Sequence, residues 1–427
     1  DYANVKAHDY TDDVLRTALS HNHSVNVSGG TDKTKVIFTL GYVNDEGIKI
    51  NSDYNRLNAS FKIRQKLAKT LDLDVDFRYT ESNLNGRENV TNGKGSNVSG
   101  AYRYRPIDNP LGGVSYSEVA SGFSFGVANI DDKHNPVELI NDITNKSYSR
   151  SLRGSAALSW EIIKGLVARS ELSLTRSSSK STYYENGYTN GDKRATLNRG
   201  MGDGLRSVST LNYNFNIGKN NVFSALLGNE VLKSDSESSQ ITGRGYPSTF
   251  DYDTTMGLIH TATTSFSATN SYSVPARTVS FFGRLSYTFM DRYLFTGTFR
   301  ADGSSKFAPD NRWGYFPAGA FAWRLSEEPF MNGTKDWLSN LKLRLSYGTS
   351  GSDNISSNLW RETWSSLGSG SNHTPINGEL GSFYRPDGLL ANSKLKWETT
   401  ISRNFGIDFG FLNNRVNGSL EDRKSVV

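Results

Sequence analysis

The sequence contains no cysteine among its 427 residues. This absence excludes a disulfide scaffold and any metal site built on thiolates. No window approaches about 18 consecutive apolar residues, so the sequence offers no candidate for a membrane-spanning helix. Charge of one sign is also scarce, because 48 basic and 43 acidic residues leave a net charge of only +5. The basic residues are dispersed, which argues against a nucleic-acid partner.

Aromatic residues and glycine are abundant instead. The chain has 22 Phe, 21 Tyr, 7 Trp and 40 Gly, yet its mean hydropathy is −0.54. Such an average fits a transmembrane β-barrel, because half of each strand faces water and the loops are hydrophilic. Length alone would suggest about two or three domains, but repetitive β architectures do not follow that rule. The chain begins at Asp1 without a methionine or a signal peptide, so we expect a fragment or a processed product.

Strict alternation of apolar and polar residues is the main structural signal. It runs through residues 281–289, with Phe282 as the exception, and resumes at residues 293–300 after a three-residue turn at 290–292. Residues 71–80 alternate without a break. Because successive side chains of a strand point to opposite faces, each such strand has an oily face and a wet face. The pattern predicts about fourteen strands, and Phe61, Phe77, Leu172, Leu285 and Leu345 are expected to point to lipid. The expected lumen-facing residues are Arg64, Asp74, Arg78, Arg169, Glu171, Arg284 and Arg344.

Short turns and long polar loops alternate between these strands. The long loops are expected at 83–148, 177–204, 233–276 and 350–393, and a short helix near 12–18. This layout predicts an all-β, antiparallel, up-and-down transmembrane β-barrel with short periplasmic turns and long extracellular loops. A soluble β-sandwich or propeller is the alternative, but it would need shorter strands and more evenly spaced turn signals.

Several segments resemble the SusC/RagA family of TonB-dependent outer-membrane transporters. The similar segments follow the family's order from residue 1 to about residue 421. They are Val27–Thr34, Ser280–Tyr287, Asp291–Thr296, Arg300–Phe307, Asn311–Pro317, Leu341–Gly348, Leu395–Thr400 and Ile407–Arg415. The resemblance implies a 22-strand barrel closed by an N-terminal plug, with a TonB box before the plug. It places residues 1–20 in an extracellular loop and residues 21–421 in about the second to the fifteenth strand.

The resemblance also implies a function and partners. The family imports large nutrients such as oligosaccharides or peptides across the outer membrane. A SusD-like lipoprotein covers the extracellular mouth, and the TonB-ExbB-ExbD complex supplies energy through an N-terminal region that lies outside this chain. No cofactor and no catalysis are implied. The alternatives are a passive porin-like barrel, a structural or adhesive barrel, and a surface enzyme acting on glycans, which would require a close carboxylate pair in a cleft.

Eight aromatic residues in the expected loops are the candidate substrate contacts. Aromatic faces stack on sugars or grip peptides, while polar neighbours fix the orientation of the ligand. The alternative is that these rings pack loop on loop or against a lid. The eight residues are Tyr102, Tyr104, Tyr183, Tyr184, Tyr188, Trp360, Trp364 and Tyr384.

Three other motifs favour simpler interpretations. The stretch 122–126 fits G-x-S-x-G but lacks the strand, helix and partner residues of a nucleophile elbow. Asp72, Asp74 and Asp76 share one strand face about 7 Å apart, and a solvated row that Arg78 partly offsets is favoured over a cation site. His21 and His23 share a face near His8, without a clearly spaced third metal ligand.

The end of the chain departs from the pattern. After Leu420 the family would continue its strand with aromatic residues, whereas this chain reads Asp422–Val427 and stops. The segment 422–427 resembles the translation of a short sequencing adapter, so we expect it not to be native. Because the family's remaining strands lie outside the chain, we also expect residues 1–421 to form an open, partly curled sheet.

Overall fold

A computed structural model gives the structure of the protein. It describes residues 8–86, 136–187, 191–366, 384–386 and 390–426. Fifteen strands form one sheet, and β14 (Trp364–Ser366) pairs with β15 (Tyr384–Pro386) in a small hairpin of its own. Within the described residues, no helix has both the length and the apolar character that a membrane crossing requires.

The large sheet is an antiparallel meander in which each strand pairs with the next one along the chain. Its strands are β1 (Ser20–Gly30), β2 (Thr34–Glu46), β3 (Asp53–Ala68), β4 (Leu71–Asn85), β5 (Ile143–Ile163), β6 (Leu166–Glu185), β7 (Arg194–Ile217), β8 (Asn221–Arg244), β9 (Ser265–Tyr272), β10 (Ala276–Phe289), β11 (Tyr293–Ser304), β12 (Trp313–Arg324), β13 (Leu338–Ser352), β16 (Glu398–Phe411) and β17 (Val416–Val426). Only β9 leaves this order, because it pairs with the far end of β8. The predicted all-β, up-and-down architecture is confirmed.

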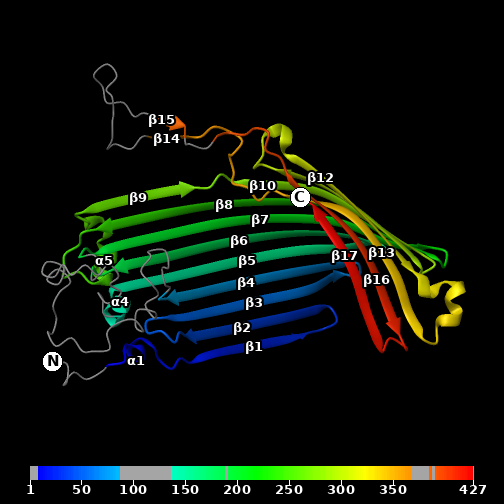
Figure 1. The fold of residues 1–427 in the computed structure, drawn as a ribbon, viewed down its shortest axis with the longest axis horizontal. Helices are drawn as coiled ribbons and strands as arrows, with labels where there is room; N and C mark the ends of the chain where they lie inside the picture. The colour runs from blue at the N-terminus through cyan, green and yellow to red at the C-terminus, as the bar shows by residue number, and fades with distance from the viewer. Residues whose placement is uncertain (1–7, 87–135, 188–190, 367–383, 387–389, 427) are drawn as a thin grey trace, which may run out of the picture.

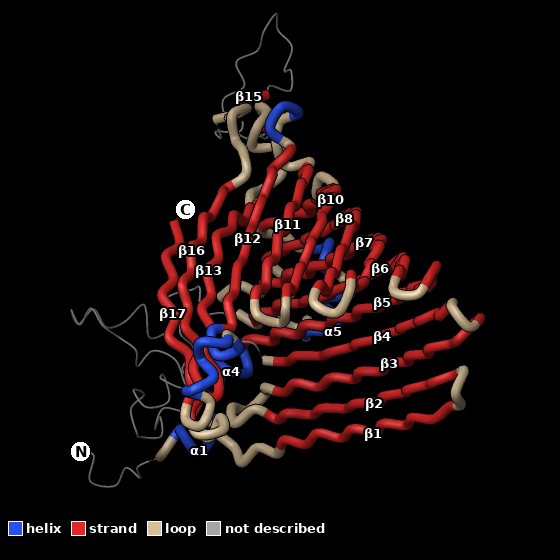
Figure 2. The backbone as a smooth tube through the Cα atoms, turned by 90° about the vertical axis from the view of Figure 1, so that its right-hand side faces the viewer, coloured by secondary structure: helices blue, strands red, loops and turns tan. Residues whose placement is uncertain are grey.

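The sheet is curled and open. Strands β16 and β17 come round in front of β4–β8 in Figure 1, and Figure 2 shows the same curl from the side of the short turns. Among the described residues, β1 and β17 are the two ends of the strand order and do not pair with each other. The expectation of an open, partly curled sheet is confirmed for this part of the chain.

The α-helices within the described residues are short. They are α1 (Tyr10–Val14), α4 (Pro136–Asp142) and α5 (Tyr252–Gly257). The helix expected near 12–18 begins earlier, at Tyr10, because the Asp9 side chain accepts a hydrogen bond from the Thr11 backbone N–H and caps it. Tyr10, Val14 and Ile140 then form a small buried cluster between α1 and α4.

The short turns lie together at the right-hand end of the sheet in Figure 1. Between β5 and β6, Gly165 has a φ of +85°, and a Cβ at that position would lie 2.3 Å from the Asn214 carbonyl oxygen. Only glycine fits both the dihedral angle and the space. Between β10 and β11, Met290 and Asp291 adopt φ values of 51° and 53°. Tight turns of this kind fix the register of the hairpins that they connect.

Two expected loops are largely strand. Each long strand has a near half beside the short turns and a far half beyond it. Residues 177–204 and 233–276 contain the far halves of β6, β7 and β8 together with β9. The prediction of loops there was wrong. It assigned strands only where apolar and polar residues alternate, and that alternation is required only where one face of a strand meets lipid. A membrane crossing takes about 9–11 strand residues, whereas β5 to β8 have 21, 20, 24 and 24. The surplus stands beyond the membrane, where no face has to meet lipid.

The register separates two faces, because directly paired residues point to the same side. The five residues expected to face lipid lie on one face, which we call the oily face, and their exposed fractions are 38–52%. The seven residues expected to face the lumen lie on the other, which we call the charged face. The predicted division of these twelve residues between the two faces is confirmed.

A band of aromatic rings crosses the oily face near the short turns. In five successive ring pairs, the ring centroids are 4.6–6.1 Å apart. The rings belong to Tyr213, Phe215, Phe223, Tyr287, Phe295 and Phe321. Bands of this kind flank the apolar belt of transmembrane barrels at the membrane–water interface. The band therefore marks the oily face as the lipid-facing side.

Strand β17 extends through the segment expected not to be native. Asp422 pairs with Phe405, and Lys424 pairs with Arg403. Since Phe405 lies on the oily face, Asp422 places a carboxylate there. The foreign origin of residues 422–427 stays a prediction, and reading the locus through codon 421 in source DNA would test it: an in-frame stop directly after Val427 would contradict it.

Candidate functional site

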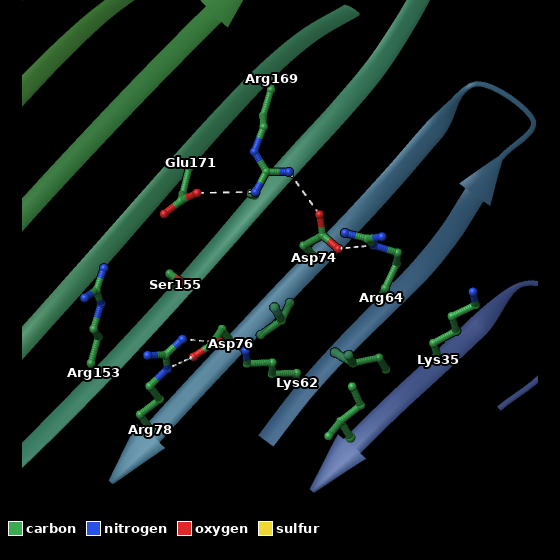
Figure 3. A pocket seen from close by; sticks show the side chains of 14 residues that line it. Lys35, Lys62, Arg64, Asp74, Asp76, Arg78, Arg153, Ser155, Arg169 and Glu171 are labelled. Carbon is green, nitrogen blue, oxygen red and sulfur yellow. Dashed lines mark hydrogen bonds and ion pairs between the residues drawn. The ribbon is translucent and has the colours of Figure 1, made fainter. Parts of the chain in front are cut away.

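The charged face of β3 to β6 is built around Asp74. Its carboxylate accepts a hydrogen bond from Arg64 Nε at 2.6 Å and another from Arg169 Nη1 at 2.9 Å. Arg169 also donates to Glu171 at 3.3 Å and to the Ser159 hydroxyl at 2.9 Å. Figure 3 shows these side chains on the near side of the strands, which is the side toward which the sheet curls in Figure 1. The charged face is therefore the concave one.

A second carboxylate on β4 has its own basic partners. Arg78 donates to Asp76 through Nε at 2.8 Å and through Nη2 at 3.1 Å, and Lys62 Nζ lies 3.4 Å from the same carboxylate. The expectation that Arg78 offsets part of the Asp72–Asp76 row is confirmed. Each pair is partly exposed, so each contributes only about 0–1 kcal/mol to stability.

These side chains surround a hollow of about 520 Å³ in the concave wall, which we call the wall hollow (Figure 3). Its charged lining comprises three acidic residues, Asp74, Asp76 and Glu171, and six basic ones. The basic residues are Lys35, Lys62, Arg64, Arg78, Arg153 and Arg169. The sequence pattern had assigned five residues of this lining to the lumen face, which are Arg64, Asp74, Arg78, Arg169 and Glu171. It did not indicate the contributions of Lys35 on β2 and Arg153 on β5.

Ion pairs continue around the wall beyond the hollow. Glu230 on β8 accepts from Arg206 at 2.7 Å and from Arg300 at 3.3 Å. Further round, Arg344 on β13 donates to Asp408 at 2.8 Å and also binds Glu421 on β17. Partly exposed charged side chains thus line the concave face from β3 to β17. Such a lining suits a wall along which polar solutes move.

Tyr183 and Tyr184 lie on the part of β6 that stands beyond the membrane. The Tyr184 ring is 4% exposed and packs edge-on against Tyr252 of α5, with centroids 5.8 Å apart. Arg194 lies over the Tyr183 ring at 5.8 Å. Burial, aided by the nearby Glu185 carboxylate, raises the pKa of Tyr183 to about 12. Tyr183 therefore remains a neutral hydroxyl at physiological pH.

Three of the other six candidate aromatics lie within the described residues. Trp360 lies beside Arg361, whose Cζ is 5.8 Å from its ring centroid. Trp364 and Tyr384 belong to the small hairpin, in register with Pro386 and Ser366. Tyr102, Tyr104 and Tyr188 lie outside the described residues, as does the G-x-S-x-G stretch at 122–126. Ligand contact by any of the eight stays a prediction.

A packed junction at the outer end of the sheet was missed at the sequence level. Phe307 is 1% exposed and its ring packs against that of Trp397 in a tilted arrangement, with centroids 5.4 Å apart. The Ser304 hydroxyl donates to Asp353 at 2.8 Å, and Trp397 Nε1 donates to the Arg312 carbonyl at 2.8 Å. We call this junction the outer latch. Except for Asp353, its residues come from three of the segments that carry the family resemblance, which was the one available signal.

The histidines on β1 do not form a metal centre with their described neighbours. The His21 and His23 rings have centroids 5.0 Å apart. Across the parts of the chain that the structure describes, no three His, Asp or Glu side chains lie together in a way that could hold a metal ion.

The fold and the wall agree with comparisons to known proteins. A model of the family described as TonB dependent receptor-like, beta-barrel, matches residues 92–421. The chain is 27% identical to TonB-dependent receptor SusC of Bacteroides thetaiotaomicron, over 97% of this chain and 41% of that protein. It is 29% identical to TonB-dependent receptor P26 of Formosa agariphila, over 96% of this chain and 40% of that protein.

A solved structure of the RagAB peptide transporter has the same fold, with a TM-score of 0.78 at 18% identity. That likeness covers 99% of this chain and 46% of the solved chain. The chain thus spans about two fifths of the length of the curated relatives it matches. It belongs to the TonB dependent receptor-like β-barrel family of the outer membrane, in agreement with its resemblance to the SusC/RagA transporters.

Proposed function

We propose that this chain forms part of the wall of an outer-membrane active transporter that imports large nutrients, either oligosaccharides or peptides. The observation that carries the proposal is the continuous charged concave face, backed by an oily face with an aromatic band. Such a wall lets a large hydrated solute pass without crossing hydrocarbon. The similarity to SusC and the RagAB peptide transporter fold support the same activity.

We assign the energy for transport and the capture of the solute to partners of the whole protein. The TonB-ExbB-ExbD complex would act through a region that precedes this chain, and a SusD-like lipoprotein would cover the outer mouth. The part of β5 to β9 that stands beyond the membrane, with α5 packed on it, offers a surface at that end of the barrel. The eight candidate aromatics are proposed as solute contacts of the transporter.

A transport role fits the chemistry of the wall better than catalysis does. Glycoside hydrolysis uses a pair of carboxyl groups on either side of the scissile bond, one of which gives up a proton. On this wall Asp74 and Asp76 each bind two basic side chains. Both carboxylates are therefore already engaged with basic side chains, which does not match a pair that flanks a scissile bond.

The experiment compares uptake in four strains: wild type, a deletion of the full-length gene, a tonB deletion, and the double deletion. Labelled oligosaccharide and peptide pools are offered, and cell-associated label is measured. We expect both single deletions to lose uptake of the same fraction and the double deletion to lose no more. A passive porin-like barrel would keep its uptake in the tonB deletion, and a structural or adhesive barrel would show no uptake defect at all.

A further inference from the structure

We propose that the wall hollow binds an anionic group of the transported solute, of the carboxylate, sulfate or phosphate class. The proposal rests on the proposed transport function, because a hollow in the concave wall meets a solute only if solutes pass along it. The six basic and three acidic residues that line it give a formal excess of three positive charges. The whole chain carries only +5, so much of its excess charge is concentrated at this one place.

The carboxylates of the hollow are already engaged. Asp74 and Glu171 together balance Arg64 and Arg169. Asp76 binds both Arg78 and Lys62 but neutralises only one of these two cations. Donors are therefore left over around the hollow, since a guanidinium carries five N–H groups in a fixed fork.

Arg153 is the clearest of the unneutralised cations. Among the described residues its guanidinium makes no ion pair, and its Nε donates only to the Ser173 hydroxyl, at 3.2 Å. It lies on β5 beside Ser155, across the hollow from Lys35 on β2, which likewise forms no ion pair within the described strands (Figure 3). An anion with two oxygens side by side, such as a carboxylate or a sulfate, can accept two parallel hydrogen bonds from Arg153.

The size of the hollow also suits one end of a large solute. About 520 Å³ lies within the range of ligand pockets, roughly 300–1,000 Å³. It is too small for a whole oligomer but large enough for one charged sugar or one acidic side chain of a peptide. Acidic side chains from the part of the full-length protein outside this chain carry the same carboxylate chemistry, so the test must separate the two sources.

The test uses the purified full-length protein in detergent and a fluorescent anion, pyrene tetrasulfonate, whose binding is followed by anisotropy. We expect saturable binding that sodium glucuronate displaces and glucose does not. Arg153→Gln should weaken the probe about five- to tenfold, because it removes a bidentate partner. Asp76→Asn should tighten it about two- to fivefold, because it frees Arg78 and Lys62; a gain of affinity cannot be a folding defect.

Arg176→Gln is the matched control. Arg176 is 66% exposed and lies in register with Leu152 on the opposite face, so its loss should leave the affinity unchanged. The proposal is overturned if Arg153→Gln binds like wild type, if Arg176→Gln loses as much, or if glucose competes as well as glucuronate. Absence of saturable binding to the wild-type protein would mean that its own acidic groups fill the hollow, which also overturns the proposal. Uptake is measured separately, so transport can stand when anion binding fails.

Discussion

The near and far halves of the same strands differ in what shapes their sequence. In β6, residues 166–174 alternate between apolar and polar side chains, whereas residues 176–182 are almost entirely Ser, Thr, Lys and Arg. Both halves pair in one unbroken register with β7. The comparison shows that oily alternation reflects contact with lipid, while strand pairing itself needs only a repeating backbone and tolerant side chains.

The far half is held by local packing instead of by lipid. The outer latch is its strongest point, so Phe307→Ala should have the largest effect of any single substitution proposed for these strands. Removing a fully buried aromatic side chain costs about 3–5 kcal/mol. We expect amide hydrogen exchange in residues 304–316 and 395–400 to rise steeply, while the near halves of β10 and β11 remain protected. Phe330→Ala is the control, because Phe330 is 68% exposed and should change nothing. Equal exchange in both variants would contradict the latch.

The near half should reject charge on its oily face, and the far half should accept it. Leu227→Arg places a charge where β8 faces lipid, at a cost of about 2–4 kcal/mol if that point is near the membrane midplane. Ser239→Arg is on the same face of β8 in its far half, and should change stability by less than about 0.5 kcal/mol. Urea unfolding of the full-length protein in lipid vesicles measures both. Similar losses would erase the distinction between the two halves.

Alanine substitution at two turn glycines distinguishes destabilisation by a steric clash from destabilisation by backbone strain. Gly165 and Gly218 both have positive φ, but only at Gly165 would a Cβ meet a neighbour, the Asn214 carbonyl oxygen at 2.3 Å. Gly218→Ala should cost about 1 kcal/mol, from its φ alone, and Gly165→Ala clearly more. Unfolding midpoints of the two variants provide the measurement. If the order is reversed, the tight approach at Gly165 is not what constrains this turn.

The smallest expected effect is a pH dependence at the short-turn rim. Hydrogen bonds from Tyr293, then Trp323, and the nearby Arg292 hold the pKa of Glu328 below its usual 4.5. The depressed pKa means that Glu328 stabilises the fold fully above about pH 4.5 and loses that contribution as pH falls through its folded pKa. Protection factors against hydrogen exchange in residues 325–334, taken relative to the intrinsic rate at each pH, should therefore fall in acid. Glu328→Gln should remove this acid sensitivity; an unchanged pH profile in that variant would refute the role of Glu328.

The sequence predicted the near halves well and the far halves poorly. Leu285 and Arg284 could be assigned to opposite faces because lipid and water demand different side chains at adjacent positions. No such demand acts on Ser177 or Ser238, so their strands were taken for loops. The wall hollow could be predicted only in part. Asp74, Asp76 and Arg169 were each expected on the lumen side, but Arg153 was not. The side chains are brought together by pairings between β4, β5 and β6, with a long loop before β5.

One measurement tests the two-faced wall most directly. The chain has no cysteine of its own, so single cysteines can be placed in turn at residues 72–79 of β4. The full-length protein is used in lipid vesicles, after any cysteine outside this chain has been replaced by serine. Each introduced cysteine is reacted with a water-soluble maleimide and, separately, with a fluorophore that brominated lipid quenches. We predict maleimide reaction at 72, 74, 76 and 78 and lipid quenching at 73, 75, 77 and 79. Reaction without alternation, or with the two sets exchanged, would contradict the assignment of the charged face to water and the oily face to lipid.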